Sequence, residues 1–120
     1  MPDARRALGA RGEELVARWY EARGYEVLDR NWRCRTGELD LVLIGRDVLV
    51  FCEVKTRTSD LFGAPVEAVT RTKVRRLRAL AAEWMSEHRG RALGSIRFDV
   101  ASVLARADSA PSVEVIEGAF

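Results

Sequence analysis

Four charged residues interrupt two apolar stretches between residues 37 and 57. Glu38 and Asp40 fall in the first stretch, and Glu53 and Lys55 fall in the second. Both stretches have the composition of strands, where uncompensated buried charge is costly. Two close carboxylates repel each other unless a cation lies between them, and oxygen ligands suit Mg²⁺ or Mn²⁺. The pattern is typical of metal-assisted phosphate chemistry, in which a lysine orients a water or offsets developing charge.

The turn between these two strands decides whether the acids meet. We expect it at Gly45-Arg46, because apolar β-formers lie on both sides. A two-residue loop would place Asp40 diagonal to Glu53, and a four-residue loop, which pairs Ile44 with Leu49, would place them directly opposite. Either arrangement leaves the acids on one side, roughly 4.5 to 8 Å apart at Cβ. A three-residue loop without a bulge would separate them, so the chemical interpretation requires an even loop or a bulge.

A purely structural explanation also fits this pattern. Lys55 could form a salt bridge with one acid while the other acids are solvated on an edge strand, and short motifs often occur by chance. Lysine is nevertheless rare here, because Lys55 and Lys73 are the only lysines among the 20 Lys and Arg residues. A compact ammonium at position 55 therefore suggests a specific role.

The first helical segment offers a third acid. Residues 8 to 23 have helical periodicity, and Gly24 is a suitable residue to end the helix. Glu13 lies at the edge of the apolar stripe, where it could join the carboxylate cluster or be an ordinary boundary glutamate. The apolar stripe is formed by Gly12, Leu15, Val16, Trp19 and Tyr20.

Two segments carry a family resemblance. Residues Gly37-Glu38-Leu39-Asp40, followed by Val50-Phe51-Cys52-Glu53-Val54-Lys55-Thr56-Arg57, resemble the signature of the PD-(D/E)XK nuclease superfamily. The similarity is to its small YraN-type branch of uncharacterised bacterial proteins, which are related to archaeal Holliday junction resolvases. Leu39 replaces the proline that often precedes the aspartate. Gly9-Ala10-Arg11-Gly12-Glu13 is similar to the family's glycine-flanked glutamate, although Val16 stands where a small residue is usual.

The resemblance implies roles for the site residues. Asp40, Glu53 and the Val54 carbonyl would bind Mg²⁺ or Mn²⁺, and Glu13 would reach the metal through a water. Lys55 would help position the attacking water. The implied catalytic residues are therefore Glu13, Asp40, Glu53 and Lys55.

Composition limits the alternatives. With 120 residues, of which 48% are hydrophobic, the chain is expected to form one domain, and a net charge of +2 permits a polyanionic partner without requiring one. Cys34 and Cys52 are expected to be free thiols in a reducing cytoplasm. His88 is the only histidine and there are only two cysteines, so the usual His/Cys zinc ligand sets cannot be completed without carboxylates. No apolar run has membrane-span length and no signal peptide is recognisable.

The order of elements predicts an α/β fold. Two helices should flank a mixed sheet in the order α-β-β-β-α-β, followed by a short edge strand. The strand before the second helix and the one after it should be parallel, joined by a crossover through that helix. This is the restriction-endonuclease-like topology that the resemblance implies. Besides the first helix and the two strands within 37–57, the expected elements are strands at 25–31, 94–104 and 113–116 and a helix at 70–89.

Basic residues gather in three places. Arg30, Arg33 and Arg35 surround Trp32 in an expected loop, where they could hold phosphates and bases, or where the tryptophan could instead cap the core. A turn-rich segment after Lys55 should lie beside the acids. A basic ridge on the second helix could contact phosphates or be a solvated face. The nucleic-acid-binding candidates are Arg33, Arg35, Arg57, Thr58, Arg71, Lys73, Arg75 and Arg78.

Three functions remain open at this point. The first is a metal-dependent endonuclease acting on DNA, including branched or damaged DNA. The second is a non-catalytic nucleic-acid-binding module, and the third is a protein-interaction adaptor working through Leu61, Phe62 and the sheet edge.

Arg97 and Asp99 are expected to form a structural pair. Analogy with resolvases implies a homodimer.

Overall fold

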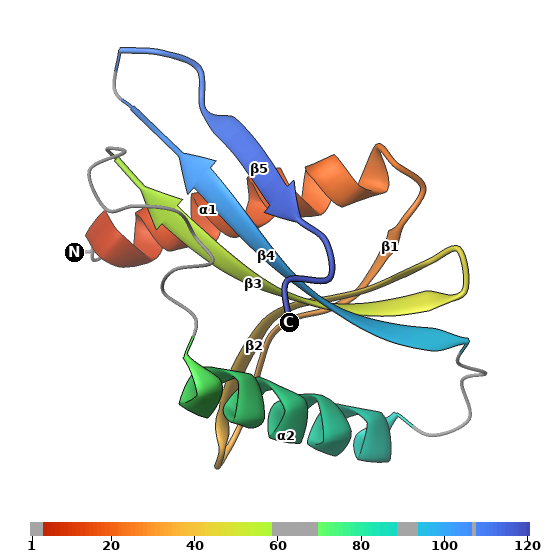
Figure 1. The fold of residues 1–120 in the computed structure, drawn as a ribbon. Helices are drawn as coiled ribbons and strands as arrows, with labels where there is room; N and C mark the ends of the chain where they lie inside the picture. Colours follow the sequence, from red (N-terminus) through yellow and green to blue (C-terminus); the bar gives the residue numbers. More distant parts are fainter. Residues whose placement is uncertain (1–3, 59–69, 89–93, 107) are drawn as a thin grey trace.

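The computed structural model describes residues 4–58, 70–88, 94–106 and 108–120, which form a five-stranded mixed sheet and two helices (Figure 1). The predicted fold class and element order are confirmed. Neither described helix has the length and apolar character needed to span a membrane. The elements are α1 (Ala4–Glu21), β1 (Glu26–Cys34), β2 (Gly37–Gly45), β3 (Val48–Arg57), α2 (Arg71–Glu87), β4 (Ser95–Leu104) and β5 (Ser112–Ile116).

The strands lie in the sheet in their chain order, β1-β2-β3-β4-β5. β1, β2 and β3 pair antiparallel, as do β4 and β5. β3 and β4 are parallel, and α2 lies in the connection between them (Figure 1). The predicted crossover is therefore confirmed, and it places α2 beside the strand that carries Glu53 and Lys55.

Two hydrophobic cores cover opposite faces of the sheet. Along β3, Val50 and Cys52 pack under α1, whereas Leu49 and Phe51 pack under α2. This alternation follows from the two-residue period of a strand. The largest fully buried side chains are Tyr20 of α1 and Trp84 of α2. Each helix is thus fixed to the sheet by its apolar stripe, as its sequence periodicity predicted.

The β2–β3 hairpin has an even register. Ile44 pairs with Leu49, which is the pairing of the four-residue-loop alternative. The strands continue one pair further, so the turn itself contains Arg46 and Asp47, with φ of 53° and 61°. The prediction of the turn at Gly45-Arg46 is therefore wrong by one residue. Gly45 is needed for packing and not for the turn, because a Cβ at this position would lie 2.6 Å from the Tyr25 ring.

The predicted loop around Trp32 is wrong, because β1 extends to Cys34. Its pairing with β2 continues until Cys34 lies opposite Gly37, despite a register shift between Val27 and Asp29. Trp32 packs against the α2 core, and its indole nitrogen lies 3.2 Å from Glu87. The tryptophan therefore caps the core, which was the alternative to a base-stacking role.

The helix boundaries also differ from the predictions. α1 begins at Ala4, four residues before the predicted start, and α2 ends at Glu87. Thr70 caps α2, as predicted, because its hydroxyl accepts a hydrogen bond from the Lys73 backbone N–H. The predicted end of α2 at residue 89, and Leu61 and Phe62 of the adaptor hypothesis, lie outside the described residues.

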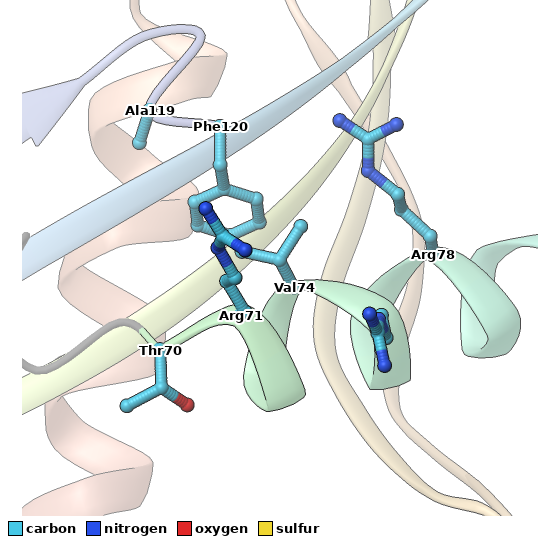
Figure 2. Close-up of a pocket in the computed structure, with 7 residues that line it drawn as sticks. Thr70, Arg71, Val74, Arg78, Ala119 and Phe120 are labelled. Atoms are coloured by element: carbon cyan, nitrogen blue, oxygen red, sulfur yellow. The ribbon is translucent and has the colours of Figure 1, made fainter.

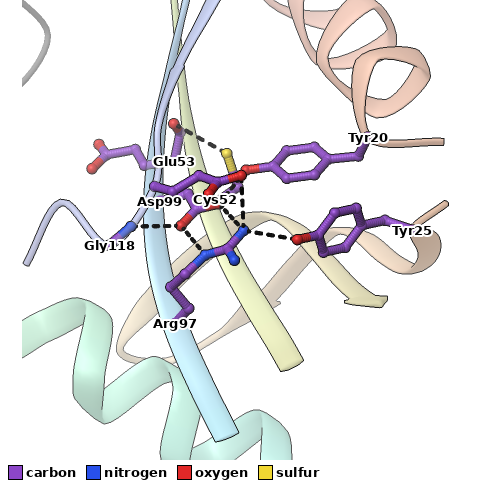
Figure 3. Close-up of polar contacts among 8 residues, drawn as sticks. Tyr20, Tyr25, Cys52, Glu53, Arg97, Asp99 and Gly118 are labelled. Atoms are coloured by element: carbon purple, nitrogen blue, oxygen red, sulfur yellow. Dashed lines mark hydrogen bonds and ion pairs between the residues drawn. The ribbon is translucent and has the colours of Figure 1, made fainter. Parts of the chain in front are cut away.

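A buried carboxylate connects α1, β4 and the C-terminal segment (Figure 3). Asp99 is fully buried and accepts hydrogen bonds from the Tyr20 hydroxyl at 2.6 Å and from Arg97 at 2.8 and 2.9 Å. The Gly118 N–H also donates to it at 3.0 Å. The predicted structural pair of Arg97 and Asp99 is confirmed. Four donated bonds compensate the burial of this charge.

Contact between α1 and β3 requires a glycine at position 12. A Cβ added there would lie 1.8 Å from Thr56 Oγ1, whereas a Cβ on Gly9 would meet nothing within 4 Å. The absence of a side chain at Gly12 therefore lets the turn of α1 that carries Glu13 approach the sheet closely.

We predict opposite effects for alanine at the two glycines of α1. Gly12→Ala should destabilise the protein by about 1 to 3 kcal/mol, because the added methyl group overlaps Thr56. Gly9→Ala, the matched control, should stabilise it by about 0.5 to 1 kcal/mol through higher helix propensity. Urea unfolding measures both. Equal stabilities for the two variants would contradict the close approach at Gly12.

Candidate active site

Asp40 and Glu53 lie close together at the open end of the β2–β3 hairpin, where both line one small cavity. Phe51 packs under α2, which places Glu53, two residues further on, toward that helix. Alternation along β2 is broken beside Asp40, because Leu39 and Val42 both pack under α2 whereas Leu41 packs under α1. The Asp40 carboxylate accepts a hydrogen bond from the Val54 N–H at 2.8 Å, which ties β2 to β3 where the paired register ends. The even register required by the chemical interpretation is therefore present.

Three carboxylates gather at the end of this hairpin. Glu13 of α1 and Glu38 and Asp40 of β2 each offer an oxygen, and the three oxygens lie within 4.8 Å of one another. Glu13 and Asp40 were predicted site residues. Glu38 was not among them, although its two-residue spacing from Asp40 placed both on one strand face.

Asn31 holds two of these acids. With its amide nitrogen turned toward them, Asn31 donates to Glu13 at 3.1 Å and to Glu38 at 2.9 Å. Its backbone has a φ of 50°, a left-handed conformation that asparagine tolerates better than most residues. Sequence reasoning missed Asn31, since no periodicity or motif marked that conformation.

Glu53 lies among two lysines instead of joining the three clustered acids. Its Oε1 is 2.9 Å from the Lys55 ammonium and 3.4 Å from that of Lys73 on α2. Its Oε2 is buried and has no hydrogen-bond partner among the described residues. A buried, unpartnered carboxylate oxygen is costly, and a cation or a donor on a ligand could satisfy it.

A small cavity lies between the two hairpin acids. Its volume is about 70 Å³, and its lining includes Asp40 and Glu53 from the strands and Leu77 from α2. That volume corresponds to roughly two water molecules at liquid density. The cavity can hold about two waters, or a cation that takes the acids as ligands in place of most of its water.

The electrostatics of the cluster favour a bound proton or cation. Burial raises the pKa of Asp40 to about 7, and the nearby charges of Glu13, Glu38 and Glu53 act in the same direction, against the Val54 hydrogen bond. Burial and the charge of Glu38 also raise the pKa of Glu13, although the Asn31 hydrogen bond opposes them. The carboxylates are therefore held together at an electrostatic cost that a divalent ion would relieve.

The two lysines differ in their proton affinity. Burial disfavours the charge of Lys55, but its hydrogen bond to Glu53 raises its pKa overall. The pKa of Lys73 is lowered instead, because its hydrogen bond with Lys55 disfavours its charged form. Lys55 is thus a firmly protonated group beside the acids, suited to holding a phosphate oxygen or a water.

The predicted nucleic-acid-binding residues divide into groups. Arg71, Arg75 and Arg78 are exposed along α2 and line a common pocket (Figure 2). Lys73 instead points toward Glu53. Arg33 lies 3.6 Å from Glu38. Three further candidates lie apart from the ridge: Arg35 in the turn after β1, Arg57 at the end of β3, and Thr58 just beyond it.

The chain is similar to a group of bacterial proteins along most of its length. A family model described as "Uncharacterised protein family UPF0102" matches residues 12–103. A UPF0102 protein of Beutenbergia cavernae is 53% identical over 115 residues, which cover 96% of this chain and 97% of that relative. A UPF0102 protein of Frankia casuarinae is 50% identical over 98% of both chains. A third, from Streptomyces griseus, is 47% identical over 97% of this chain and 98% of its own length.

The raised pKa of Asp40 predicts a pH dependence of stability without metal. In the unfolded chain the carboxyl ionises near its ordinary value of 3.8, whereas in the folded protein it ionises at about 7. The folded state binds more protons between these values, so stability should fall as pH rises through this window. Asp40→Asn removes this loss and should be more stable than wild type by about 1 to 3 kcal/mol at pH 8.

Urea unfolding in EDTA at pH 4 and pH 8 measures this effect. The difference between Asp40→Asn and wild type should be small at pH 4 and large at pH 8. Glu114→Gln, which alters an exposed acid on β5, serves as the control and should show no such divergence. A constant difference at both pH values would contradict the perturbed ionisation of Asp40.

Proposed function

The chain belongs to the uncharacterised protein family UPF0102, and we propose that it is a metal-dependent endonuclease that hydrolyses DNA phosphodiester bonds. The observation that carries this proposal is the cluster of Glu13, Glu38 and Asp40, with the paired Glu53 and Lys55 beside Asp40. Three acids and an ammonium at one location are suited to phosphoryl chemistry and are costly as a purely structural feature.

The fold supports the same proposal. The α-β-β-β-α-β order with a parallel β3–β4 pair is the arrangement expected from the resemblance to restriction-endonuclease-like proteins. Residues that match the PD-(D/E)XK motif lie at the start of β2 and in β3. Fold alone does not specify chemistry, so the proposal rests on the side chains at the site.

The donor set fits Mg²⁺ or Mn²⁺. Asp40, Glu13 and Glu38 offer oxygens within 4.8 Å of one another, and Glu53 offers a buried oxygen without a partner. Hard divalent cations prefer such oxygen ligands. The bound ion would supply Lewis acidity at a phosphate oxygen and lower the pKa of the attacking water.

The chain's own residues would orient the reaction. Lys55, kept protonated by Glu53, can donate to a phosphate oxygen or to the water and stabilise charge that develops on the phosphate. Lys73 contacts the same carboxylate from α2, which supports a role in orienting Glu53 in addition to phosphate binding. Glu13 would align a water through its carboxylate, while Asn31 fixes that side chain.

The surroundings support a DNA substrate. The exposed arginines of α2 belong to the same helix as Lys73, which contacts Glu53, and such cations provide sequence-independent contacts with phosphates. The free thiols Cys34 and Cys52 are compatible with a cytoplasmic location. A branched or damaged substrate and a homodimer remain predictions from the resemblance to resolvases.

We predict that Mn²⁺-dependent cleavage requires Lys55. Wild type incubated with linear, nicked and four-way DNA should yield cleavage products on at least one substrate, and Lys55→Ala should reduce the rate by about 100-fold or more. Arg18→Ala is a control, because Arg18 pairs with Glu14 on the exposed surface of α1. Gel electrophoresis of the products measures the rates.

Identical products from wild type and Lys55→Ala would overturn the enzymatic proposal. DNA binding that depends steeply on salt, and that is unaffected by EDTA and by Asp40→Asn, would then favour the non-catalytic binding module. Failure to bind any nucleic acid at low salt would favour the adaptor.

A further inference from the structure

A groove runs between α2 and the C-terminal segment, on the side of α2 that does not contact Glu53. It consists of two adjoining pockets of about 470 and 410 Å³ that share Arg78 and Phe120. We call it the α2 groove. Its lining residues are Thr70, Arg71, Val74, Arg75, Arg78, Ala81, Met85, Ile96, Arg97, Phe98, Gly118, Ala119 and Phe120.

An aromatic column leads from the core into this groove. Phe51 and Phe98 stack at 5.7 Å with their planes 26° apart, and Phe98 and Phe120 stack at 5.8 Å and 25°. Phe51 is buried, whereas Phe120 is partly exposed and lines the groove (Figure 2). The outermost ring can therefore accept one more planar group, because every base offers a π-face for stacking.

The charge of the groove selects an anionic ligand. Arg71, Arg75 and Arg78 project from one side of α2, and the groove's lining includes no acidic side chain among the described residues. Arg97 on the opposite side is occupied by its ion pair with Asp99. The three α2 arginines are thus the cations available to a ligand that lies against Phe120.

The groove and the candidate active site lie on opposite sides of α2. Lys73 contacts Glu53, whereas Arg75 and Arg78 are rotated from Lys73 by roughly 160° and 140° around the helix, at about 100° per residue. Along the helix axis, Lys73 and Arg78 are separated by roughly 8 Å. One oligonucleotide would have to pass around α2 to reach both the acids and the groove.

We propose that the α2 groove binds an unpaired nucleotide of DNA, with its base stacked on Phe120 and its flanking phosphates on Arg71, Arg75 and Arg78. A base paired in a duplex cannot offer its face to the ring, so this groove would favour substrates with single-stranded segments. The inference rests on the proposed action on DNA and adds to it the class of DNA that is bound.

The test compares two labelled oligonucleotides of equal length in EDTA, one a short oligothymidylate and one with the same backbone but abasic. Wild type should bind the thymidylate about tenfold more tightly, because stacking of a base contributes an effect of this order. Phe120→Leu, which keeps an apolar side chain, should abolish that preference. Phe120→Trp should retain it.

The arginine contacts are tested separately through the salt dependence of binding. Arg75→Gln should weaken binding of both oligonucleotides equally and reduce the slope of log affinity against log salt by about 1. Arg18→Gln, with the same change in net charge on α1, is the control and should leave both the slope and the preference for bases unchanged.

Two results would overturn this inference. One is an unchanged preference for bases in Phe120→Leu, and the other is an acidic peptide that competes as strongly as the oligothymidylate, since the groove would then be a protein-binding surface. Cleavage in Mn²⁺ is measured separately with Lys55→Ala. If Lys55→Ala loses cleavage but Phe120→Leu keeps the preference for bases, the groove is rejected and the nuclease proposal stands. If Lys55→Ala cleaves like wild type but Phe120→Leu loses the preference for bases, only the nuclease proposal is rejected.

Discussion

Repulsion among carboxylates is the constraint on which this structure depends. Glu13, Glu38 and Asp40 come from two elements to within 4.8 Å, and burial adds to the cost of their charge. Asn31 and the Val54 N–H offset part of that cost through hydrogen bonds. A proton or a cation bound by the acids would offset more of that cost, and a hard divalent cation would have the required charge and ligand preference.

The remainder of the fold keeps these groups together. The contact of Gly12 with Thr56 brings α1 against β3, and the Asp99 network ties Tyr20 of that helix to β4. The second core fixes α2 on the opposite face, from which Lys73 reaches Glu53. Two helices on opposite sides of the sheet thus both contribute to one site, although the chain between them spans three strands.

Sequence patterns predicted the elements that obey simple periodicity. The α/β order and the parallel crossover followed from apolar spacing and turn signals, whereas the sequence left the register of the hairpin open between odd and even loops. Features that depend on tertiary contacts were missed. Examples are the extension of β1 through Trp32, which packing against α2 stabilises, and the left-handed Asn31 that holds Glu13. Lys73 was predicted to contact phosphates together with the arginines of α2. Its contact with Glu53 could not be predicted, because that distance depends on how α2 packs on the sheet, which no local pattern records.

The central claim is that carboxylates from α1, β2 and β3 form one divalent-cation site. Crystals soaked in Mn²⁺ and measured for anomalous scattering test it most directly. We expect a peak bounded by Asp40 and at least one of Glu13, Glu38 and Glu53, and its loss in Asp40→Asn crystals soaked in the same way. The absence of a peak at saturating Mn²⁺, or peaks found only away from these acids, would contradict a shared cation site.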